Sequence, residues 1–402
     1  MQLTKADKRK ILILGASLVQ VPMIVRAKEL GFHVATCDNR PENPGHVLAD
    51  ASFSVSTTDR EGVLKIAEAN RVDGIVVTSD SAAPTAAWVA SKLGLPTHPS
   101  ESVDILCDKS RFRSFLRANG FKTPDFVSLG RGEDPSEIVR LGFPLLVKPV
   151  DSSGSRGVSV VHQPDRIPAA IAHALDHSRS GHVIAEEYIE PFGHAITGEG
   201  FSVDGKLVFR MYTNDLRDPI FPLYSVCVTL PLEHDSSTIA RIDREIQRAF
   251  DLLQLRTGPY NFDIRIDSQG NPVLMEIAPR IGGGGMPQMA RACHGVDLLG
   301  MTLLSATGHP VHPGRPLDST GCWAAYELNS LQAGVFRALS LDPDFERDHV
   351  KQLHLTTASG ERIGRFGDPG GIIGFAVLHF DAVENQEQLF GSIRRSIQVL
   401  VD

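Results

Sequence analysis

A lysine followed by small polar residues and glycines is a group that could bind phosphate. The stretch KPVDSSGSRG (residues 148–157) directly follows the apolar run FPLLV, so Lys148 stands at the end of an expected buried strand. Glycines let backbone N–H groups approach anionic oxygens, and serines add hydroxyl donors. This is not the P-loop order, because the lysine precedes the glycines and the strand-like run GVSVV follows them. The pattern favours a β-hairpin flap over phosphates, although a lysine that snorkels to solvent beside a surface hairpin stays open.

Two carboxylates lie on the arms of an expected antiparallel hairpin. Asp263 is in NFDIRID and Glu276 in LMEIAPR, with SQGN between the arms. Strict alternation places Glu276 on the same face as Leu274. A carboxylate in an apolar strand needs a cation, and two facing carboxylates suit Mg²⁺, which completes its shell with nucleotide phosphates. A salt bridge from Glu276 to Arg280 or Arg265 explains the pattern equally well.

A run of four glycines follows the second arm, in RIGGGGMPQM (residues 280–289). The backbone N–H groups of Gly282, Gly283 and Gly284 could meet an anionic group of a substrate. A flexible connection to the next helix is an equal alternative.

The elements that must position these residues indicate an α/β protein. Residues 10–100 alternate apolar strands with helices, as in a parallel α/β unit. A dinucleotide site in this unit is disfavoured, because Gly15, Ser17 and Gln20 stand where G-x-G-x-x-G needs three glycines. Further along, the patterns predict a cationic amphipathic helix at 104–120, a D-G hairpin at 201–214 and a terminal helix at 384–401.

Bulk composition limits the classes of function. The chain has 402 residues, 42% of them hydrophobic, which predicts a soluble protein of two or three domains. Its net charge of −8 disfavours bulk nucleic-acid binding, and it has no apolar run of about 18 residues that could span a membrane. The five cysteines include no CxxC pair, which favours reduced thiols. We therefore expect a cytoplasmic protein.

The order of these elements and motifs resembles the ATP-grasp superfamily, in particular its carboxylate–amine ligase branch. That branch includes formate-dependent glycinamide ribonucleotide transformylase, biotin carboxylase and the halves of carbamoyl-phosphate synthase. The similarity covers about residues 10–310 and is specific to no single member. It implies an N-terminal parallel-sheet α/β domain (1–103), a two-lobed α+β ATP-grasp domain (104–310, flap lobe about 122–186) and a small C-terminal α/β subdomain (311–402).

The resemblance also implies roles for individual residues. Asp263 and Glu276 match the paired metal ligands, and Arg280 matches an arginine near the transferred phosphoryl group. Many relatives have Asn two residues after the second metal carboxylate, and Ala278 stands there in this chain, which puts a second metal ion in doubt. The residues that match ATP-binding positions are the two phosphate lysines, the flap, the hinge beside the adenine and a ribose contact: Lys109, Lys148, Ser153, Gly154, Ser155, Arg156, Gly157, Val158, Glu186, Glu187, Tyr188, Ile189 and His194.

Proteins of this kind use ATP with Mg²⁺ (or Mn²⁺), and many form homodimers. The resemblance implies a ligase that activates a small carboxylate as an acyl phosphate, releases ADP and joins the carboxylate to an amine. A bicarbonate-activating carboxylase or carbamoyl-phosphate-type enzyme is one alternative. Another is a regulatory protein that binds ATP without turnover, which the alanine at position 278 keeps open.

Overall fold

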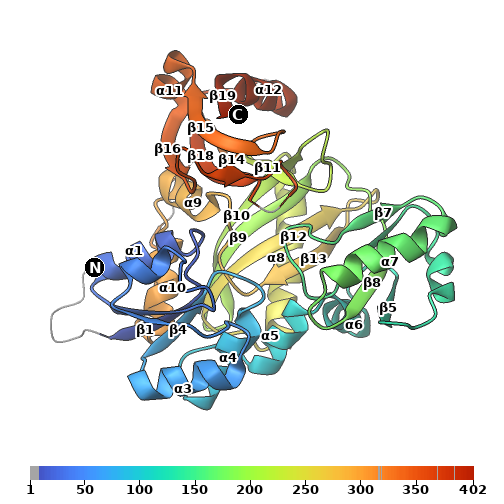
Figure 1. The fold of residues 1–402 in the computed structure, drawn as a ribbon. Coiled ribbons are helices and arrows are strands. Elements are labelled where there is room, and N and C mark those ends of the chain that lie inside the picture. The colour runs from blue at the N-terminus through green and yellow to red at the C-terminus, as the bar shows by residue number, and fades with distance from the viewer. Residues whose placement is uncertain (1–8, 316, 318, 369, 384) are drawn as a thin grey trace.

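The N-terminal part of the chain is a parallel α/β unit, as the alternating pattern predicted. The computed structural model describes residues 9–315, 317, 319–368, 370–383 and 385–402. The unit's sheet has the order β3-β2-β1-β4 with parallel pairing throughout, and helices flank it (Figure 1). Its elements are β1 (Lys10–Leu14), α1 (Val21–Leu30), β2 (His33–Cys37), α2 (Gly45–Leu48), β3 (Ala51–Phe53), α3 (Arg60–Asn70), β4 (Gly74–Val77) and α4 (Ala83–Lys92).

The next helical segment differs from the single helix expected at 104–120. It consists of α5 (Ser100–Cys107) and α6 (Lys109–Ala118), separated at Asp108, whose φ of −118° lies outside the helical region. The Asp108 carboxylate accepts hydrogen bonds from the N–H groups of Ser110 (2.8 Å) and Arg111 (3.0 Å), which is an N-cap. The capping aspartate therefore starts a new helix, and the expected domain boundary at 103/104 falls inside α5.

The flap lobe is a separate four-stranded antiparallel sheet, drawn in green at the right of Figure 1. Its order is β5-β8-β6-β7, and β6 pairs with β7 through Leu145↔Val161 and Val147↔Ser159. This pairing gives the expected strand–loop–strand arrangement around residues 150–158. The lobe contains β5 (Phe126–Gly130), η2 (Ser136–Leu141), β6 (Leu145–Pro149), β7 (Ser159–Val161), η3 (Pro164–Arg166), α7 (Ile167–Asp176) and β8 (His182–Glu187).

The largest sheet has eight strands in the order β13-β12-β9-β10-β11-β14-β18-β16. The expected D-G hairpin joins β9 and β10, and its turn residues Asp204 and Gly205 both have positive φ (49° and 78°), as a type I′ turn requires. One face of the sheet packs on α8 (Ser236–Leu252). The strands are β9 (Ala195–Val203), β10 (Lys206–Arg217), β11 (Ser225–Leu230), β12 (Gly258–Ile266), β13 (Pro272–Ala278), β14 (Cys322–Asn329), β16 (Val350–Leu355) and β18 (Ile372–Phe380).

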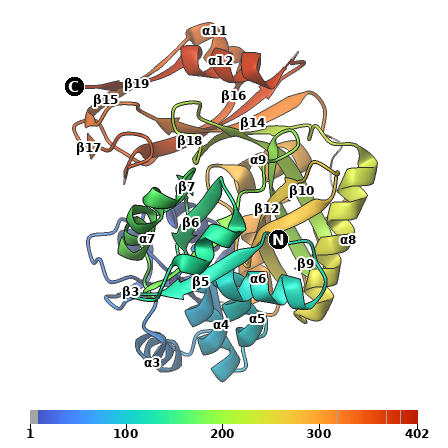
Figure 2. The same cartoon turned by 90° about the vertical axis from the view of Figure 1, so that its right-hand side faces the viewer.

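The C-terminal strands extend this same sheet, because β11 pairs directly with β14. The expected terminal helix is shorter than predicted: α12 (Gln386–Ser396) ends and Ile397–Val401 forms β19, which pairs with β15. In the run IQVLV, exposed residues alternate with buried or partly buried ones, which is the period of a strand. The remaining elements are α9 (Met286–His294), α10 (Leu298–Ala306), β15 (Gly334–Leu341), α11 (Pro343–His349) and β17 (Arg362–Ile363). In Figure 2 the C-terminal strands and helices α11 and α12 lie above the N-terminal unit and the flap lobe. Within the described residues, every helix is too short or too polar to cross a lipid bilayer.

Candidate active site

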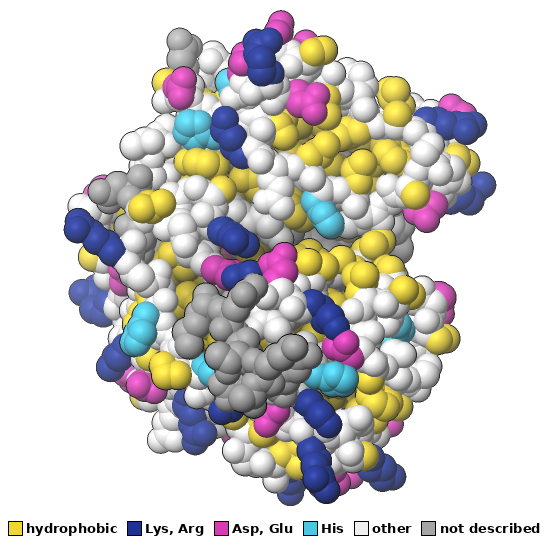
Figure 3. Space-filling model, turned by 90° about the vertical axis from the view of Figure 1, so that its left-hand side faces the viewer, with side chains coloured by type: hydrophobic (Ala, Val, Ile, Leu, Met, Phe, Trp, Pro, Cys, Tyr) yellow, Lys and Arg dark blue, Asp and Glu magenta, His cyan; other side chains and the backbone are white. Residues whose placement is uncertain are grey.

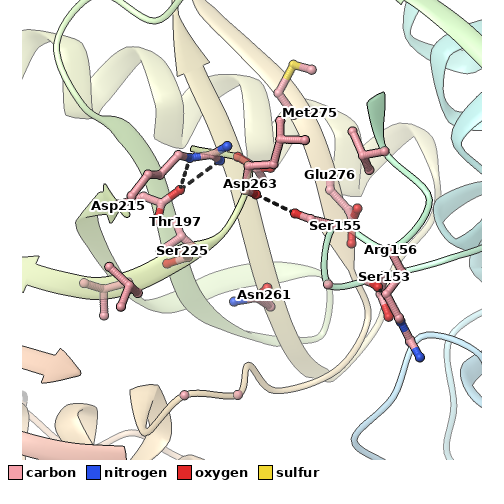
Figure 4. A pocket seen from close by; sticks show the side chains of 18 of the residues that line it. Ser153, Ser155, Arg156, Thr197, Asp215, Ser225, Asn261, Asp263, Met275 and Glu276 are labelled. Carbon is pink, nitrogen blue, oxygen red and sulfur yellow. Dashed lines mark hydrogen bonds and ion pairs between the residues drawn. The ribbon is translucent and has the colours of Figure 1, made fainter. Parts of the chain in front are cut away.

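A cavity of about 350 Å³ lies between the flap lobe and the large sheet. It is lined by residues from β6, the flap, β10, β12, β13 and the glycine run. Figure 4 shows side chains of the flap and of the strands meeting at this cavity. Most of the residues expected to act in catalysis or to bind ATP, metal or a substrate anion line this cavity: Lys109, Lys148, Ser153, Gly154, Ser155, Arg156, Val158, Tyr188, Asp263, Glu276, Arg280, Gly283 and Gly284.

Lys148 is buried at the end of β6 and forms an ion pair with Glu186 on β8. The other oxygen of Glu186 accepts from Arg113 Nε at 3.0 Å, and Arg113 is itself completely buried on α6. Burial opposes the charge on Glu186, but the two cations outweigh it and lower the pKa of that carboxyl to about 2. Burial lowers the pKa of Lys148, and the opposing effect of the Glu186 carboxylate, which raises it, is smaller. The structure therefore holds Lys148 in a fixed position at the cavity wall.

The expected hinge residues divide into separate groups. Glu186 points its carboxylate at Lys148 and Arg113, an interaction that the sequence did not predict. Tyr188 lines the cavity, whereas Glu187 is exposed and Ile189 is outside the lining. His194 also lies outside the lining, with Nε2 3.7 Å from Glu233 Oε2.

Asp263 and Glu276 are direct cross-strand partners on β12 and β13, and both point into the cavity (Figure 4). The expectation that Glu276 shares a face with Leu274 was wrong. A register shift lies between Asp263 and Ile264, so Leu274 packs into the core under α8 while Glu276 faces the cavity. A bulge of this kind re-aims side chains that strict alternation would separate.

Glu276 forms its ion pair with Lys109, not with Arg280 or Arg265, the two partners considered from the sequence. Lys109 Nζ, at the start of α6, lies 3.4 Å from Glu276 Oε2 and donates to the Ser152 carbonyl oxygen at 2.8 Å. Burial opposes the charge on Lys109, but the Glu276 and Asp80 carboxylates raise its pKa. Arg280 instead pairs with Asp80, through Nε (2.8 Å) and Nη2 (2.9 Å). Asp80 was missed by sequence reasoning, although its place just after β4 is a usual one for functional residues of an α/β sheet.

A second acidic residue on the cavity wall was also missed. Asp215 on β10 accepts from Arg217 through Nε (3.1 Å) and Nη2 (3.0 Å). Its other oxygen, Oδ1, is buried and has no hydrogen-bond partner in the described part of the chain. Burial raises the pKa of Asp263, and the neighbouring charges of Asp215 and Glu276 raise it further against Arg265 and Arg217. A bound cation would relieve this repulsion of Asp263 by the two neighbouring carboxylates.

The donor set fits one divalent ion of the magnesium type. Mg²⁺ binds through one or two carboxylates and takes the rest of its oxygen ligands from water and phosphates. Asp263 and Glu276 supply two such carboxylates. No group of three or more His, Cys, Asp or Glu residues suited to a metal occurs among the residues that the structure describes.

The flap lies against the cavity and contacts the opposite side. Ser155 Oγ donates to the Leu223 carbonyl oxygen at 2.6 Å, and Arg156 Nε donates to the Ser153 carbonyl oxygen at 3.1 Å. Gly157 does not line the cavity. Its φ is +75°, and a Cβ there would lie 2.8 Å from the Cβ of His177, so glycine is required for packing.

The glycine run is held by a buried glutamate on β9. The Gly282 N–H donates to Glu199 Oε1 at 2.8 Å, and a Cβ at Gly282 would lie 2.0 Å from that oxygen. Gly283 and Gly284 reach the cavity, whereas Gly282 does not. Glu199 carries no sequence signal, because it stands within a strand far from the glycines.

Comparison with known proteins agrees with this arrangement. Residues 141–288 match the family model described as the ATP-grasp domain, in agreement with the resemblance found in the sequence. The chain is 29% identical over 185 residues to formate-dependent phosphoribosylglycinamide formyltransferase of Synechococcus sp. (strain WH7803), which is 45% of this chain and 48% of that protein. The chain thus spans about half the length of the curated transformylases that it matches.

Solved structures show the same fold over nearly the whole chain. The L-amino acid ligase from Bacillus licheniformis has a TM-score of 0.79 at 20% identity, covering 98% of this chain and 99% of that one. Phosphoribosylglycinamide synthetase from Anaerococcus prevotii has a TM-score of 0.77 at 17% identity, covering 98% and 100%. At these identities the similarity establishes the fold alone, which is the α/β architecture expected from the sequence.

Proposed function

We propose that this protein is an ATP-dependent ligase that activates a small carboxylate as an acyl phosphate and joins it to an amine, releasing ADP and phosphate. The observation that carries the proposal is the single cavity in which Lys109, Lys148 and Arg280 surround the Asp263–Glu276 pair beneath a glycine-containing flap. Such a set of cations and carboxylates suits phosphoryl transfer, which depends on positioning and charge neutralisation.

The chain's own residues have distinct tasks in this reaction. Lys148 and Lys109 bind phosphate oxygens of ATP, and their ion pairs with Glu186 and Glu276 keep them oriented. Asp263 and Glu276 hold Mg²⁺ or Mn²⁺, which neutralises charge on the nucleotide phosphates. The flap, through Ser153 to Arg156, covers the phosphates and excludes water, which would otherwise hydrolyse an acyl phosphate.

The first reaction step needs a carboxylate beside the terminal phosphate. A substrate carboxylate oxygen attacks the γ-phosphorus, the bond to the β,γ-bridging oxygen breaks, and ADP leaves. Arg280, held by Asp80, provides positive charge for the transferred phosphoryl group.

The proposal is tested by screening amino acids, small carboxylates and amines for stimulated release of ADP and phosphate. We expect Lys148→Ala and Glu276→Gln to lower the stimulated rate by at least about 100-fold, the usual cost of removing a group that stabilises transition-state charge. The matched control is Lys206→Ala, which removes an exposed lysine paired with Asp251 outside the cavity and should leave the rate unchanged. Near-normal rates in either site variant, or release of AMP and pyrophosphate, would contradict the proposal.

A further inference from the structure

A second cavity of about 310 Å³ lies beside the first, and its lining is largely apolar. It is enclosed by the loop after β1, the start of α1, the glycine run and the strands β16 and β18. Its apolar walls include Val19, Met23, Ile281, Ile372 and Phe375. Figure 3 shows the side of the molecule that carries the N-terminal unit and the C-terminal strands, with hydrophobic side chains on both sides of a hollow between its upper and lower parts.

The two cavities share part of their walls. Gly283, Gly284 and Glu327 line both of them. Gly284 has a φ of +59°, and a Cβ at this position would lie 2.9 Å from Glu327 Oε1. Glycine therefore leaves space at the junction in front of the Glu327 carboxylate, so a ligand could extend from one cavity to the other.

Glu327 is a half-buried carboxylate on β14 without a compensating group. Its carboxylate forms neither a hydrogen bond nor an ion pair with any other described residue, whereas Asp80, Glu186 and Glu276 are all paired with cations. Burial raises the pKa of Glu327 to about 7, and the charge of Asp215 adds to the effect. A ligand group that donates hydrogen bonds and carries positive charge would satisfy this carboxylate.

The charges around the two cavities separate two kinds of substrate group. Lys109, Lys148 and Arg280 favour phosphate and carboxylate groups on the ATP side. Glu327 repels such anions and attracts an ammonium group, and the adjoining walls exclude charge but accept hydrocarbon.

We propose that the second cavity binds the amine substrate, a primary amine with an apolar substituent, with its nitrogen at Glu327 and its hydrocarbon part against Val19, Ile372 and Phe375. This inference rests on the proposed ligase function and names the class of its second substrate. Glu327 then acts as a catalytic residue, since it touches the nucleophile.

The second half-reaction balances with these groups alone. The amine enters as an ammonium and gives one proton to the Glu327 carboxylate, which leaves a neutral nitrogen. That nitrogen attacks the acyl carbon and the C–N bond forms. The bond from the acyl carbon to the phosphate oxygen breaks, and phosphate leaves with the electron pair and takes the second proton of the nitrogen.

Hydroxylamine separates this proposal from the proposed function. It traps an acyl phosphate as a hydroxamate and, being largely uncharged at neutral pH, does not need Glu327 to remove a proton. Wild-type protein with ATP and Mg²⁺ should form a hydroxamate with at least one carboxylate of the screen. The absence of hydroxamate with every carboxylate would overturn the proposed function and this inference together.

The amine site is then tested with isoamylamine, ethylamine and O-phosphoethanolamine as acceptors. We expect isoamylamine to have a KM at least about tenfold below that of ethylamine, the discrimination that a few methylenes in an apolar pocket provide, and O-phosphoethanolamine to be a poor acceptor. Glu327→Gln should lower the rate of coupling to isoamylamine at least about tenfold more than it lowers the rate of hydroxamate formation.

A polar substitution in the apolar wall of the second cavity gives a second, independent test. Ile372→Gln should raise the KM for isoamylamine about tenfold, a larger change than it causes in the KM for ethylamine. Leu353→Gln is the matched control, because Leu353 is a partly exposed leucine on neighbouring β16 that lines neither cavity. If hydroxamate forms but the amines do not differ, or if the Glu327 and Ile372 variants couple isoamylamine normally, the assignment of this cavity is wrong while the ligase function stands.

Discussion

At the scale of single residues, Glu199 shows how a buried carboxyl group can position a loop in its neutral form. Oε1 accepts hydrogen bonds from the Gly282 N–H (2.8 Å) and from Asn261 Nδ2 (3.2 Å). Oε2 is buried and has no hydrogen-bond partner among the described residues. Burial raises the pKa of Glu199 to about 8, so the carboxyl group is mostly protonated at neutral pH.

This shifted pKa predicts a pH-dependent stability that Glu199→Gln should remove. Between about pH 4.5 and about pH 8, the unfolded chain loses this proton while the folded chain keeps it, so the free energy of unfolding falls as pH rises. A glutamine accepts the same hydrogen bonds and does not titrate. We therefore expect the Tm of the variant, relative to wild type, to rise across this window in thermal unfolding experiments.

The control for this measurement is Glu137→Gln, an exposed glutamate in the flap lobe. Its Tm should follow the wild-type pH dependence. Parallel Tm curves for Glu199→Gln and wild type would show that Glu199 is ionised in the folded protein.

Sequence spacing predicted the site residues that lie within recognisable motifs, and it missed their partners. Lys148, Asp263 and Glu276 each stand in a local pattern of strand and turn residues. Asp80 could not be found in this way, because it is separated from Arg280 by 200 positions and only the folded chain brings them together. Arg113 was hidden for a similar reason, since on an amphipathic helix a buried arginine has the same sequence pattern as an exposed one.

At the scale of elements, the break between α5 and α6 places Lys109 at a helix start. The Asp108 carboxylate caps α6, and the next residue, Lys109, reaches both Glu276 and the flap carbonyl of Ser152. If α5 and α6 were one continuous helix, the side chain of Lys109 would point in a different direction. The amphipathic pattern of 104–120 is continuous across both helices, so periodicity alone did not reveal the break. The bulge beside Asp263 was missed for a different reason: β13 (PVLMEIA) is apolar on both sides of Glu276, so its sequence has no polar–apolar alternation that an extra residue would visibly interrupt.

Asp108→Ala should therefore affect both stability and nucleotide binding. Loss of an N-cap costs about 1 kcal/mol, measured as a lower free energy of unfolding. Because α6 begins with Lys109, we also expect the KM for ATP to rise several-fold. Asp235→Ala is the matched control: Asp235 caps α8 by accepting from the Thr238 N–H at 2.7 Å, and it lies outside the cavity lining. The control should lose similar stability without a change in KM, and an equal KM effect in both variants would contradict the role of α6.

At the scale of the whole molecule, the loop between β10 and β11 (residues 218–224) connects the flap to the C-terminal part. Its Leu223 carbonyl oxygen accepts from Ser155 of the flap. At its other end, the completely buried Asp218 accepts from Arg394 Nη1 on α12 at 2.9 Å. Phe221 packs edge-on against Phe366, with ring centroids 5.8 Å apart. The flap is thus supported by residues from the end of the chain.

Arg394→Ala should loosen this connection, since it leaves the buried Asp218 carboxylate without its cation. We expect faster hydrogen exchange in residues 218–224 and in the flap, together with a several-fold higher KM for ATP. Arg337→Ala is the control, because Arg337 pairs with Asp402 on the exposed surface of the same C-terminal part. Unchanged exchange in the flap of the Arg394 variant would show that the loop does not transmit this support.

The eight-stranded sheet also bears on whether a fragment ending at residue 310 could fold by itself. A fragment cut at residue 310 would lose β14, and the N–H and C=O groups of β11 would then form an open edge. The residues of that strand from Val226 to Leu230 are buried in the intact chain, so the edge would be both unpaired and apolar. Such edges recruit strands from other molecules. We therefore expect residues 1–310 not to fold as an independent module, and a chain that stops before its last quarter to self-associate.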